Sequence, residues 1–183
     1  TAKVESWGNV VTPEMFYRHR QALGAAMDQV PAVALEADRE WSALTGRSYG
    51  LVERYRCDGA GIVIVTMGSM CGTARDAVDT MRDDGLAVGL VKVRLFRPLP
   101  VQALVAALEG VPQVLVLDRN YSPGHGGVLH QELRAALYGM PRAPRIHGYL
   151  AGVGGVNVSP SRIAEFVRTA SGSEPQPHSV WVR

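Results

Sequence analysis

The residues with the clearest potential for chemistry lie in the stretch GIVIVTMGSMCGTARDAVDTM, residues 61 to 81. An apolar segment typical of a buried strand leads into Gly68, Ser69, Gly72 and Thr73, and a helical pattern follows. Glycines let a backbone approach a ligand, hydroxyls form hydrogen bonds, and the first amides of a helix can bind an anion. This loop is therefore a candidate anion- or nucleotide-binding turn.

The loop nevertheless departs from the known phosphate-binding motifs. No lysine follows Gly72, as GxxxxGK[ST] requires, and the glycines are spaced wrongly for GxGxxG. No acidic residue closes the next apolar segment, where a carboxylate that binds ribose is expected. The alternative is a tight strand-to-helix turn over residues 68–73, with Gly72 packed against a neighbouring backbone. We adopt that structural interpretation.

Two further segments carry candidate residues. Arg97, in FRPLP, can clamp a carboxylate or phosphate with its guanidinium, or pair with an acidic residue of a neighbouring element. The segment DRNYSPGHGG, residues 118 to 127, places Asp118, Arg119 and His125 in one flexible loop. It is a candidate catalytic loop, although no nucleophile stands beside a base in the sequence. Its asparagine, proline and glycines are typical of turns.

The sequence does not indicate a metal site. Cys57 and Cys71 do not form a CxxC motif, so the cysteines predict neither a zinc site nor an iron–sulfur cluster. His125 and His130 are five residues apart, with no third ligand nearby. Two free thiols are typical of a reducing compartment, and we therefore expect a cytoplasmic protein.

Composition narrows the class of protein further. The chain has 183 residues, of which 46% are hydrophobic and 20% charged, as in ordinary globular domains. A net charge of +2, without any basic run, argues against binding to nucleic acid or to an anionic membrane. No apolar run approaches the roughly 20 residues that span a bilayer, and no signal peptide is visible. Because the chain begins with Thr1 rather than Met, we expect a fragment or a processed product.

Local signals divide the chain into an arm, a domain and a tail. Thr12 and Gly46 are the expected ends of two helices, over residues 12–29 and 31–44, that form a helical arm (1–48). Strands then alternate with helices over residues 49–170, and a tail with turn composition follows (171–183). The expected strands lie near 49–56, 61–67, 88–94, 113–118 and 145–150, and the expected helices near 73–84, 101–109, 127–138 and 160–170. This alternation predicts an α/β fold, with a parallel sheet between two layers of helices.

The motifs in combination resemble a known family. VTMGSMCGTARDAVDTMRDDGLAVGLVKVRLFRPLP, VLDRNYSPGHGG and AGVGGVNVSP together resemble the alpha subunit of pyruvate:ferredoxin oxidoreductase and related 2-oxoacid:acceptor oxidoreductases that use thiamine diphosphate. The resemblance extends from about Gly8 to Val167. For residues 49–170 it implies a fold like the carboxy-terminal domain of transketolase. That fold has a five-stranded sheet in the order 1-3-2-4-5, with only the first strand antiparallel.

The resemblance also implies a division of labour. In this family thiamine diphosphate and Mg²⁺ lie between two other domains, and electrons leave through iron–sulfur clusters to ferredoxin. This chain resembles the second domain of the alpha subunit and lacks the pyrimidine-binding domain, a GDG…N motif and cluster cysteines. We therefore expect no cofactor in this chain. We predict a non-catalytic domain that supports assembly and the conversion of a 2-oxoacid to acyl-CoA by the full complex.

Two other functions stay open at this point. One is a regulatory domain that binds a small anion or nucleotide at the loop of Gly68, Ser69, Gly72 and Thr73. The other is an independent flavodoxin-like enzyme that uses residues of the 118–127 loop. The apolar stripes of the expected arm further suggest partners, which are either other domains or subunits of the oxidoreductase or a second copy of the chain.

Overall fold

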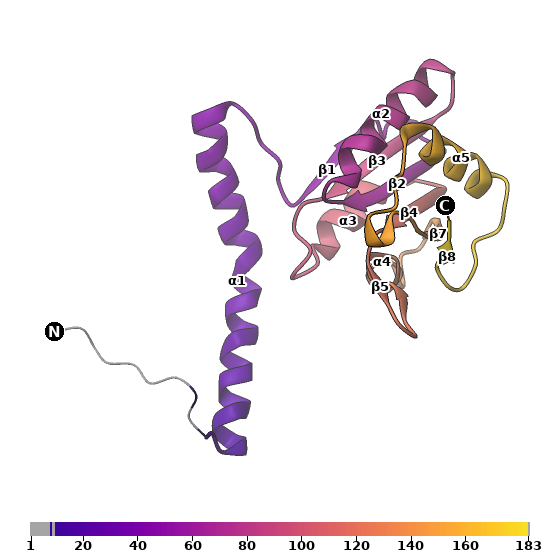
Figure 1. Ribbon diagram of the computed structural model, residues 1–183. Coiled ribbons are helices and arrows are strands. Elements are labelled where there is room, and N and C mark those ends of the chain that lie inside the picture. The colour runs from indigo at the N-terminus through magenta and orange to yellow at the C-terminus, as the bar shows by residue number, and fades with distance from the viewer. Residues whose placement is uncertain (1–7, 9, 183) are drawn as a thin grey trace.

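The computed structural model describes residue 8 and residues 10–182 (Figure 1). Residues 1–7 and 9 of the expected arm and Arg183 of the expected tail lie outside the described residues. The helices are α1 (Pro13–Thr45), α2 (Met70–Asp83), α3 (Val101–Leu108), α4 (Val128–Ala136), α5 (Pro160–Ser171) and the short 3-10 helix η1 (Val153–Gly155). The strands are β1 (Val52–Tyr55), β2 (Ile62–Met67), β3 (Val88–Val93), β4 (Gln113–Asp118), β5 (Tyr121–Ser122), β6 (Gly126–Gly127), β7 (Arg145–Leu150) and β8 (Val180–Trp181).

The main sheet has the strand order β1-β3-β2-β4-β7-β8. Strand β1 pairs antiparallel with β3, whereas the other neighbouring pairs are parallel. The five expected strands are therefore present in the expected order, and the implied direction of the first strand is confirmed. The sheet gains a sixth strand, β8, which comes from the segment expected to be a tail.

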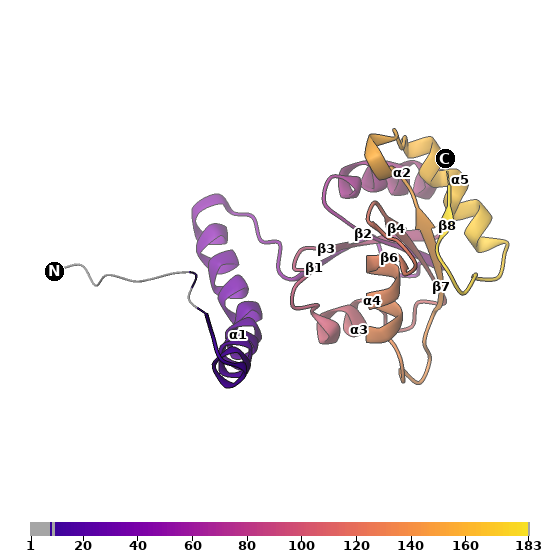
Figure 2. The ribbon, with the colours of Figure 1, turned by 60° about the horizontal axis from the view of Figure 1, so that its bottom comes forward.

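Helices cover both faces of this sheet, as the three-layer prediction requires (Figure 2). On one face Ile64 and Leu90 pack in a buried cluster with residues of α2 and α5, among them Met81 and Ile163. On the other face a second cluster joins Val63 and Val65 to apolar residues of α3 and α4. Successive β2 residues thus enter opposite cores, which follows from the two-residue period of a strand.

The amino-terminal region corrects the expectation of two helices. Helix α1 is continuous through Pro31, with Thr12 Oγ1 accepting a hydrogen bond from Met15 N at 3.3 Å and Gly46 ending the helix at φ 69°. The predicted break at Pro31 is wrong. Proline removes one backbone hydrogen bond from the helix, but its fixed φ suits a helix, and α1 continues through it. Helix α1 lies beside the domain at the end of an extended connection (Figure 1), and none of its residues Pro13–Thr45 is buried.

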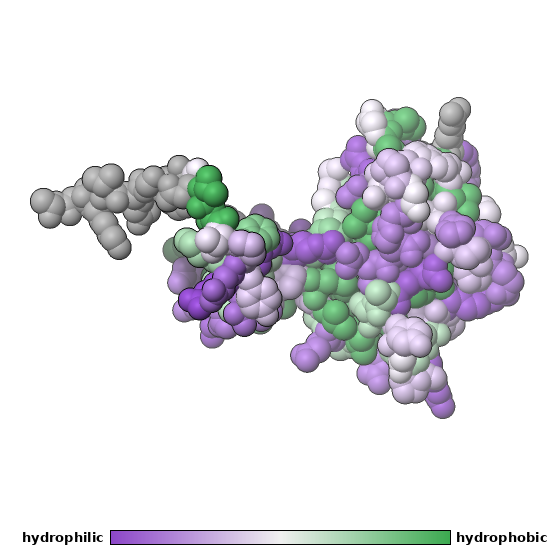
Figure 3. Space-filling model, turned by 90° about the horizontal axis from the view of Figure 1, so that it is seen from below, coloured by the Kyte–Doolittle hydropathy of each residue, from purple (hydrophilic) through white to green (hydrophobic). Residues whose placement is uncertain are grey.

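Contact between α1 and the domain is limited. The Asp38 carboxylate accepts hydrogen bonds from Tyr49 N at 2.8 Å and Ser48 Oγ at 2.6 Å, which ties α1 to the connection. A cavity of about 390 Å³ lies between Asp28 and Pro31 of α1 and residues 51 and 98–103 of the domain. The domain surface on the side of α1 includes hydrophobic residues (Figure 3). Among the described residues, no helix has both the length and the apolar character needed to cross a bilayer.

One close approach of backbone and side chain allows a test of this packing. Replacement of Gly148 by alanine is expected to lower the free energy of unfolding by about 1–3 kcal/mol. The added methyl group would lie 2.3 Å from Nδ1 of the buried His130. Urea unfolding followed by circular dichroism gives the measurement.

The control is Gly72→Ala. A methyl group there meets nothing within 4 Å, so the expected change lies between zero and a gain of about 1 kcal/mol. Equal losses in both variants would contradict the packing described for Gly148. The same open surroundings show that the predicted packing of Gly72 against a neighbouring backbone is wrong.

Candidate functional site

Three of the glycine-rich loops meet at the carboxyl ends of the parallel strands, where ligands bind in folds of this kind. Ser69, Thr73 and Arg119 line a cavity there of about 220 Å³, together with Met70 and residues 155–158. The loop after β2, the loop after β4 and the loop after β7 each contribute to it. The structure thus brings together Ser69, Thr73 and Arg119 from the set of candidate residues.

The turn after β2 is shorter than expected. Gly68 adopts φ 67°, a conformation that favours glycine, and α2 already begins at Met70. Ser69 has helical torsions, so its hydroxyl does not cap α2. That hydroxyl instead accepts a hydrogen bond from Arg119 Nη1 at 2.8 Å. The expected 68–73 loop is therefore a two-residue turn followed by the first turn of α2.

Arg119 links the three loops. Its Nη1 donates to Ser69, and its Nε donates to the carbonyl oxygen of Gly152 at 3.3 Å. Arg119 is exposed, and it lines the same cavity as Met70 and Thr73 of the first turn of α2. A guanidinium and a helix N-terminus are suited to an anion. Binding of an anion at Ser69, Thr73 and Arg119 stays a prediction.

Asp118 has a structural role at the end of β4. Its Oδ2 accepts hydrogen bonds from Leu129 N at 2.6 Å and His130 N at 3.3 Å, and Oδ1 accepts from Asn120 N at 2.9 Å. The carboxylate therefore satisfies amides at the start of α4. Burial raises the pKa of Asp118, although the same backbone hydrogen bonds act in the opposite direction.

Asp118 and Arg119 contact different partners, and His125 lies in the turn of a small hairpin. Residues 118–127, expected to be a flexible loop, form a small hairpin in which β5 pairs antiparallel with β6. His125 lies exposed in its turn, and its amide donates to the Ser122 carbonyl at 2.9 Å. No sequence signal beyond turn composition predicted this hairpin, because its strands are only two residues long.

Arg97 forms an ion pair with the neighbouring helix. Its Nη2 lies 2.7 Å from Glu132 Oε1 of α4, and its guanidinium lies over the ring of Phe96, 4.1 Å from the centroid. This corresponds to the structural alternative considered for Arg97. A role of Arg97 in binding a ligand stays a prediction.

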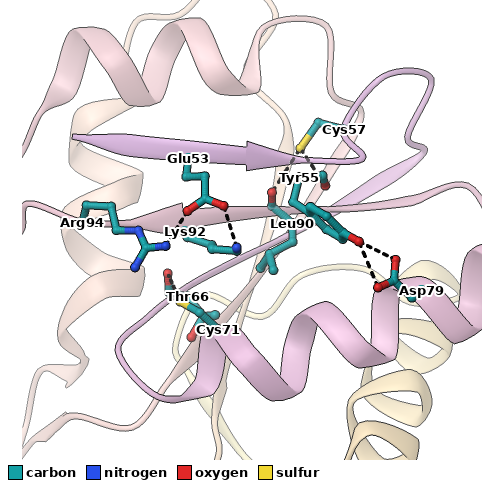
Figure 4. Close-up of polar contacts among 9 residues, drawn as sticks. All are labelled: Glu53, Tyr55, Cys57, Thr66, Cys71, Asp79, Leu90, Lys92 and Arg94. Atoms are coloured by element: carbon teal, nitrogen blue, oxygen red, sulfur yellow. Dashed lines mark hydrogen bonds and ion pairs between the residues drawn. The ribbon is translucent and has the colours of Figure 1, made fainter. Parts of the chain in front are cut away.

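Sequence reasoning missed a network of charged residues at β1 and β3, drawn in Figure 4. Lys92 is only 5% exposed, and its Nζ lies 2.7 Å from Glu53 Oε1. Arg94 pairs with the other oxygen of Glu53. Burial acts to raise the pKa of Glu53, but the hydrogen bonds from Arg94 and Lys92 outweigh it, and the pKa is lowered. One signal was available, since Lys92 is the sole charged residue in the apolar run VGLVKV.

The same network joins β1 to α2. Tyr55 donates its hydroxyl proton to Asp79, with oxygen–oxygen distances of 2.7 and 2.9 Å, and Arg56 Nη1 lies 2.9 Å from Asp79 Oδ1. The hydrogen bond from Tyr55 and the ion pair with Arg56 lower the pKa of Asp79. These contacts attach the antiparallel edge strand to the rest of the domain.

The cysteines are buried in different places. Cys57 Sγ lies 3.3 Å from the Leu90 carbonyl oxygen, and Cys71 Sγ lies 3.7 Å from that of Thr66. Both of these described thiols are free, and burial raises the pKa of each. Thiols with raised pKa values are poor nucleophiles and poor metal ligands at neutral pH. Across residues 8 and 10–182, no group of three His, Cys, Asp or Glu side chains is placed to hold a metal ion.

His130 and His147 are buried, and the sequence predicted no function for either residue. His130 is fully buried, and its Nδ1 lies 2.9 Å from Ser179 Oγ near β8. Burial, together with the charge of Arg134, lowers the pKa of His130 to about 4. His130 is therefore neutral at physiological pH and serves to position the segment that carries β8.

Comparison with known proteins shows the family to which this chain belongs. Residues 60–163 match the family model described as pyruvate:ferredoxin oxidoreductase core domain II. Pyruvate synthase subunit PorA of Methanothermobacter thermautotrophicus is 38% identical over 177 residues, which are 97% of this chain and 45% of that protein. Ketoisovalerate oxidoreductase subunit VorA of Pyrococcus abyssi is 38% identical over 149 residues, which are 81% of this chain and 38% of that protein.

A solved structure agrees with these relatives. The 2-oxoglutarate:ferredoxin oxidoreductase of Magnetococcus marinus matches with a TM-score of 0.53 and 25% identity, over 71% of this chain and 21% of that one. The fold and the sequence thus define a domain of the 2-oxoacid oxidoreductase class. The chain belongs to the pyruvate:ferredoxin oxidoreductase core domain II family. It spans less than half the length of the PorA and VorA relatives named above.

The role of Asp118 can be tested by substitution. Asp118→Ala is expected to lower the free energy of unfolding by about 2–3 kcal/mol, because three backbone amides lose a charged acceptor. Chemical unfolding measures the loss. His125→Ala, in the exposed turn of the same hairpin, is the control and should change stability by no more than about 0.5 kcal/mol. An unchanged stability of Asp118→Ala would contradict the structural role.

The Glu53 network predicts a dependence of stability on pH. A carboxyl group whose pKa is lowered by folding contributes stability above its unfolded pKa of about 4.3, and that contribution is lost as the pH falls through the folded pKa. Glu53→Gln should therefore be less stable than the parent chain at pH 7, and the difference should shrink as the pH falls toward 3. Melting temperatures from pH 7 to pH 3 provide the measurement. A constant difference would contradict the lowered pKa of Glu53.

Proposed function

We propose that this chain is the second domain of the alpha subunit of a 2-oxoacid:ferredoxin oxidoreductase. In this role it supports assembly and shapes the enzyme without holding the reacting atoms. The observation that carries the proposal is the family match over residues 60–163. It is supported by relatives named as PorA and VorA subunits and by the alpha subunit of a phenylglyoxylate dehydrogenase, which is 37% identical over 149 residues.

The geometry of the carboxyl edge supports a non-catalytic role. Arg119 is directed to Ser69 and Gly152, Asp118 to the amides of α4, and Arg97 to Glu132. Each of these contacts joins one element of the domain to another. A general acid or base must instead reach a proton of the substrate. These side chains therefore hold the loops in place.

We infer that thiamine diphosphate, Mg²⁺ and the iron–sulfur clusters of the parent complex bind outside this chain. The chemistry of its potential ligands supports this. Both thiols are buried against carbonyl oxygens and have raised pKa values, which does not suit a cluster. The charged carboxylates Glu53 and Asp79 are already paired with cations or a tyrosine. These thiols and carboxylates therefore do not suit a cluster or a metal ion, which supports placing these groups in the rest of the complex.

The remaining parts of the proposal concern partners and location. The complex would pass electrons to ferredoxin, and this domain would contact other domains or subunits of the oxidoreductase. A cytoplasmic location is proposed because both thiols are free. We also propose that the chain consists of an arm over 1–48, a domain over 49–170 and a terminal segment over 171–183. The family match favours this function over a small-anion or nucleotide-binding regulatory domain.

The activity of the isolated chain is the test. With thiamine diphosphate, Mg²⁺, coenzyme A, pyruvate and a viologen, the 183-residue chain is expected to give no sustained reduction of the viologen, because the groups that carry the chemistry lie elsewhere. The complete complex that contains this sequence should reduce the viologen under the same conditions.

Two variants of the complex sharpen this test. Arg119→Ala and His125→Ala in the complex should keep kcat within about threefold of the parent, since the proposal places the reacting atoms outside this domain. Sustained turnover by the isolated chain would overturn the proposal. A loss of kcat by more than about a hundredfold in these variants, with assembly intact, would assign them to the reaction instead.

A further inference from the structure

A cavity of about 400 Å³ lies between strand β7, helix α5 and the segment of residues 173–182 that carries β8. We call it the β7–α5 cavity. The chain turns back after α5, so that β8 pairs with β7 (Figure 1). This cavity shares no lining residue with the one that Arg119 lines at the carboxyl ends of the strands. Its volume lies in the range of roughly 300–1,000 Å³ that is typical of sites for small molecules.

Buried aromatic side chains form the base of the β7–α5 cavity. Tyr149 is 7% exposed and Phe166 5%, and their rings pack edge to face with centroids 5.9 Å apart. Thr169 and Gln176 also line the cavity but are exposed, so the lining reaches the molecular surface. A molecule can therefore enter from solvent. A planar ring is suited to this base, because aromatic rings pack favourably on one another in offset or edge-to-face arrangements.

His147 adds a buried polar group to the same lining. It is only 2% exposed, and its Nε2 has no hydrogen-bond partner within residues 8 and 10–182. Burial lowers the pKa of His147, so the ring is neutral near pH 7. A neutral imidazole has one N–H donor and one acceptor nitrogen. A buried polar group without a partner lowers stability, and a ligand with a matching donor or acceptor would remove that cost.

The charged side chains of the lining are already paired. Arg162 forms an ion pair with Glu165, and Glu174 Oε1 lies 2.8 Å from Arg145 Nη1. An ionic ligand would have to compete with these pairs or enter the cavity without a counter-ion, and burial of an unpaired charge is costly. The cavity therefore favours a neutral ligand.

We propose that the β7–α5 cavity binds a neutral, planar heteroaromatic molecule, the chemical class to which the purine bases belong. The ring would pack against Tyr149 and Phe166, and a ring nitrogen or amino group would provide a hydrogen-bond partner for the His147 imidazole. Gln176, whose amide has both donors and an acceptor, would contact further polar atoms. This binding goes beyond the function proposed above and does not depend on it, because it involves no step of the oxidoreductase reaction.

Binding of adenine is the first measurement. Titration of the 183-residue chain near pH 7, followed by saturation-transfer NMR, is expected to give a dissociation constant below about 1 mM. Benzoate, a planar anion, should bind at least about tenfold more weakly, because Arg162 is already paired with Glu165. Absence of adenine binding overturns the proposal. Equal binding of adenine and benzoate overturns the assignment to a neutral ligand.

A matched pair of variants tests the location of the site. Thr169→Trp places a large side chain at the cavity and should weaken adenine binding more than about tenfold. Thr80→Trp is the control, since Thr80 is also an exposed helix residue whose hydroxyl donates to the carbonyl four residues earlier. Thr80 lies on α2 and outside the cavity, so its variant should bind adenine within about twofold of the parent. Equal losses in the two variants overturn the location.

The His147 ring gives a second readout that does not rely on affinity. Adenine should shift the nitrogen-15 resonance of His147 Nε2 and leave the ring resonances of the exposed His125 unchanged. His147→Phe keeps a buried ring but removes its nitrogens, and it should weaken adenine binding about tenfold. An unmoved His147 resonance in adenine-saturated protein overturns the proposed contact. If His147→Phe does not fold, the resonances of the parent chain and the Thr169→Trp variant decide.

Discussion

Strand β2 lies at the centre of the sheet, and its residues Val63, Ile64 and Val65 have no exposed surface. Its backbone bonds to β3 on one side and to β4 on the other. A strand shielded on both faces needs a layer of helices on each side, because each face contributes apolar side chains. The positions of α2, α3, α4 and α5 follow from this requirement. The meeting of the loops after β2, β4 and β7 at one edge of the sheet follows from the same requirement.

The meeting of these loops does not by itself make a site. In open α/β sheets this edge is where ligands bind, yet here its polar side chains are used to join elements of the domain. Arg119 joins three loops, Asp118 holds the start of α4, and Arg97 pairs with Glu132. The domain thus has the general architecture of a ligand-binding fold, while Arg119, Asp118 and Arg97 connect its loops and helices.

Sequence reasoning correctly predicted those elements whose signals lie in neighbouring residues. The expected strands near 61–67 and 113–118 are β2 and β4, and Thr12 and Gly46 were correctly predicted as the outer ends of the helical arm. The direction of β1 came from the family resemblance, since a four-residue strand has no local signal for direction. The prediction that the arm has two helices, separated at Pro31, was wrong because α1 continues through this residue. The partners of Lys92 and Asp118 could not be predicted, because Glu53 is 39 residues from Lys92 and the amides that Asp118 binds are presented only when α4 docks.

The two outer strands of the sheet give the domain a means of avoiding aggregation. An open strand edge is a template on which another chain can add a strand. At one edge β1 is short and carries Glu53 and Arg54, whose charges discourage such an addition. At the other edge β8 covers Tyr149 and Leu150 of β7, and Trp181 packs on Tyr121 with ring centroids 4.8 Å apart. Strand β8 thus pairs with the part of β7 that would otherwise form an open edge of the sheet.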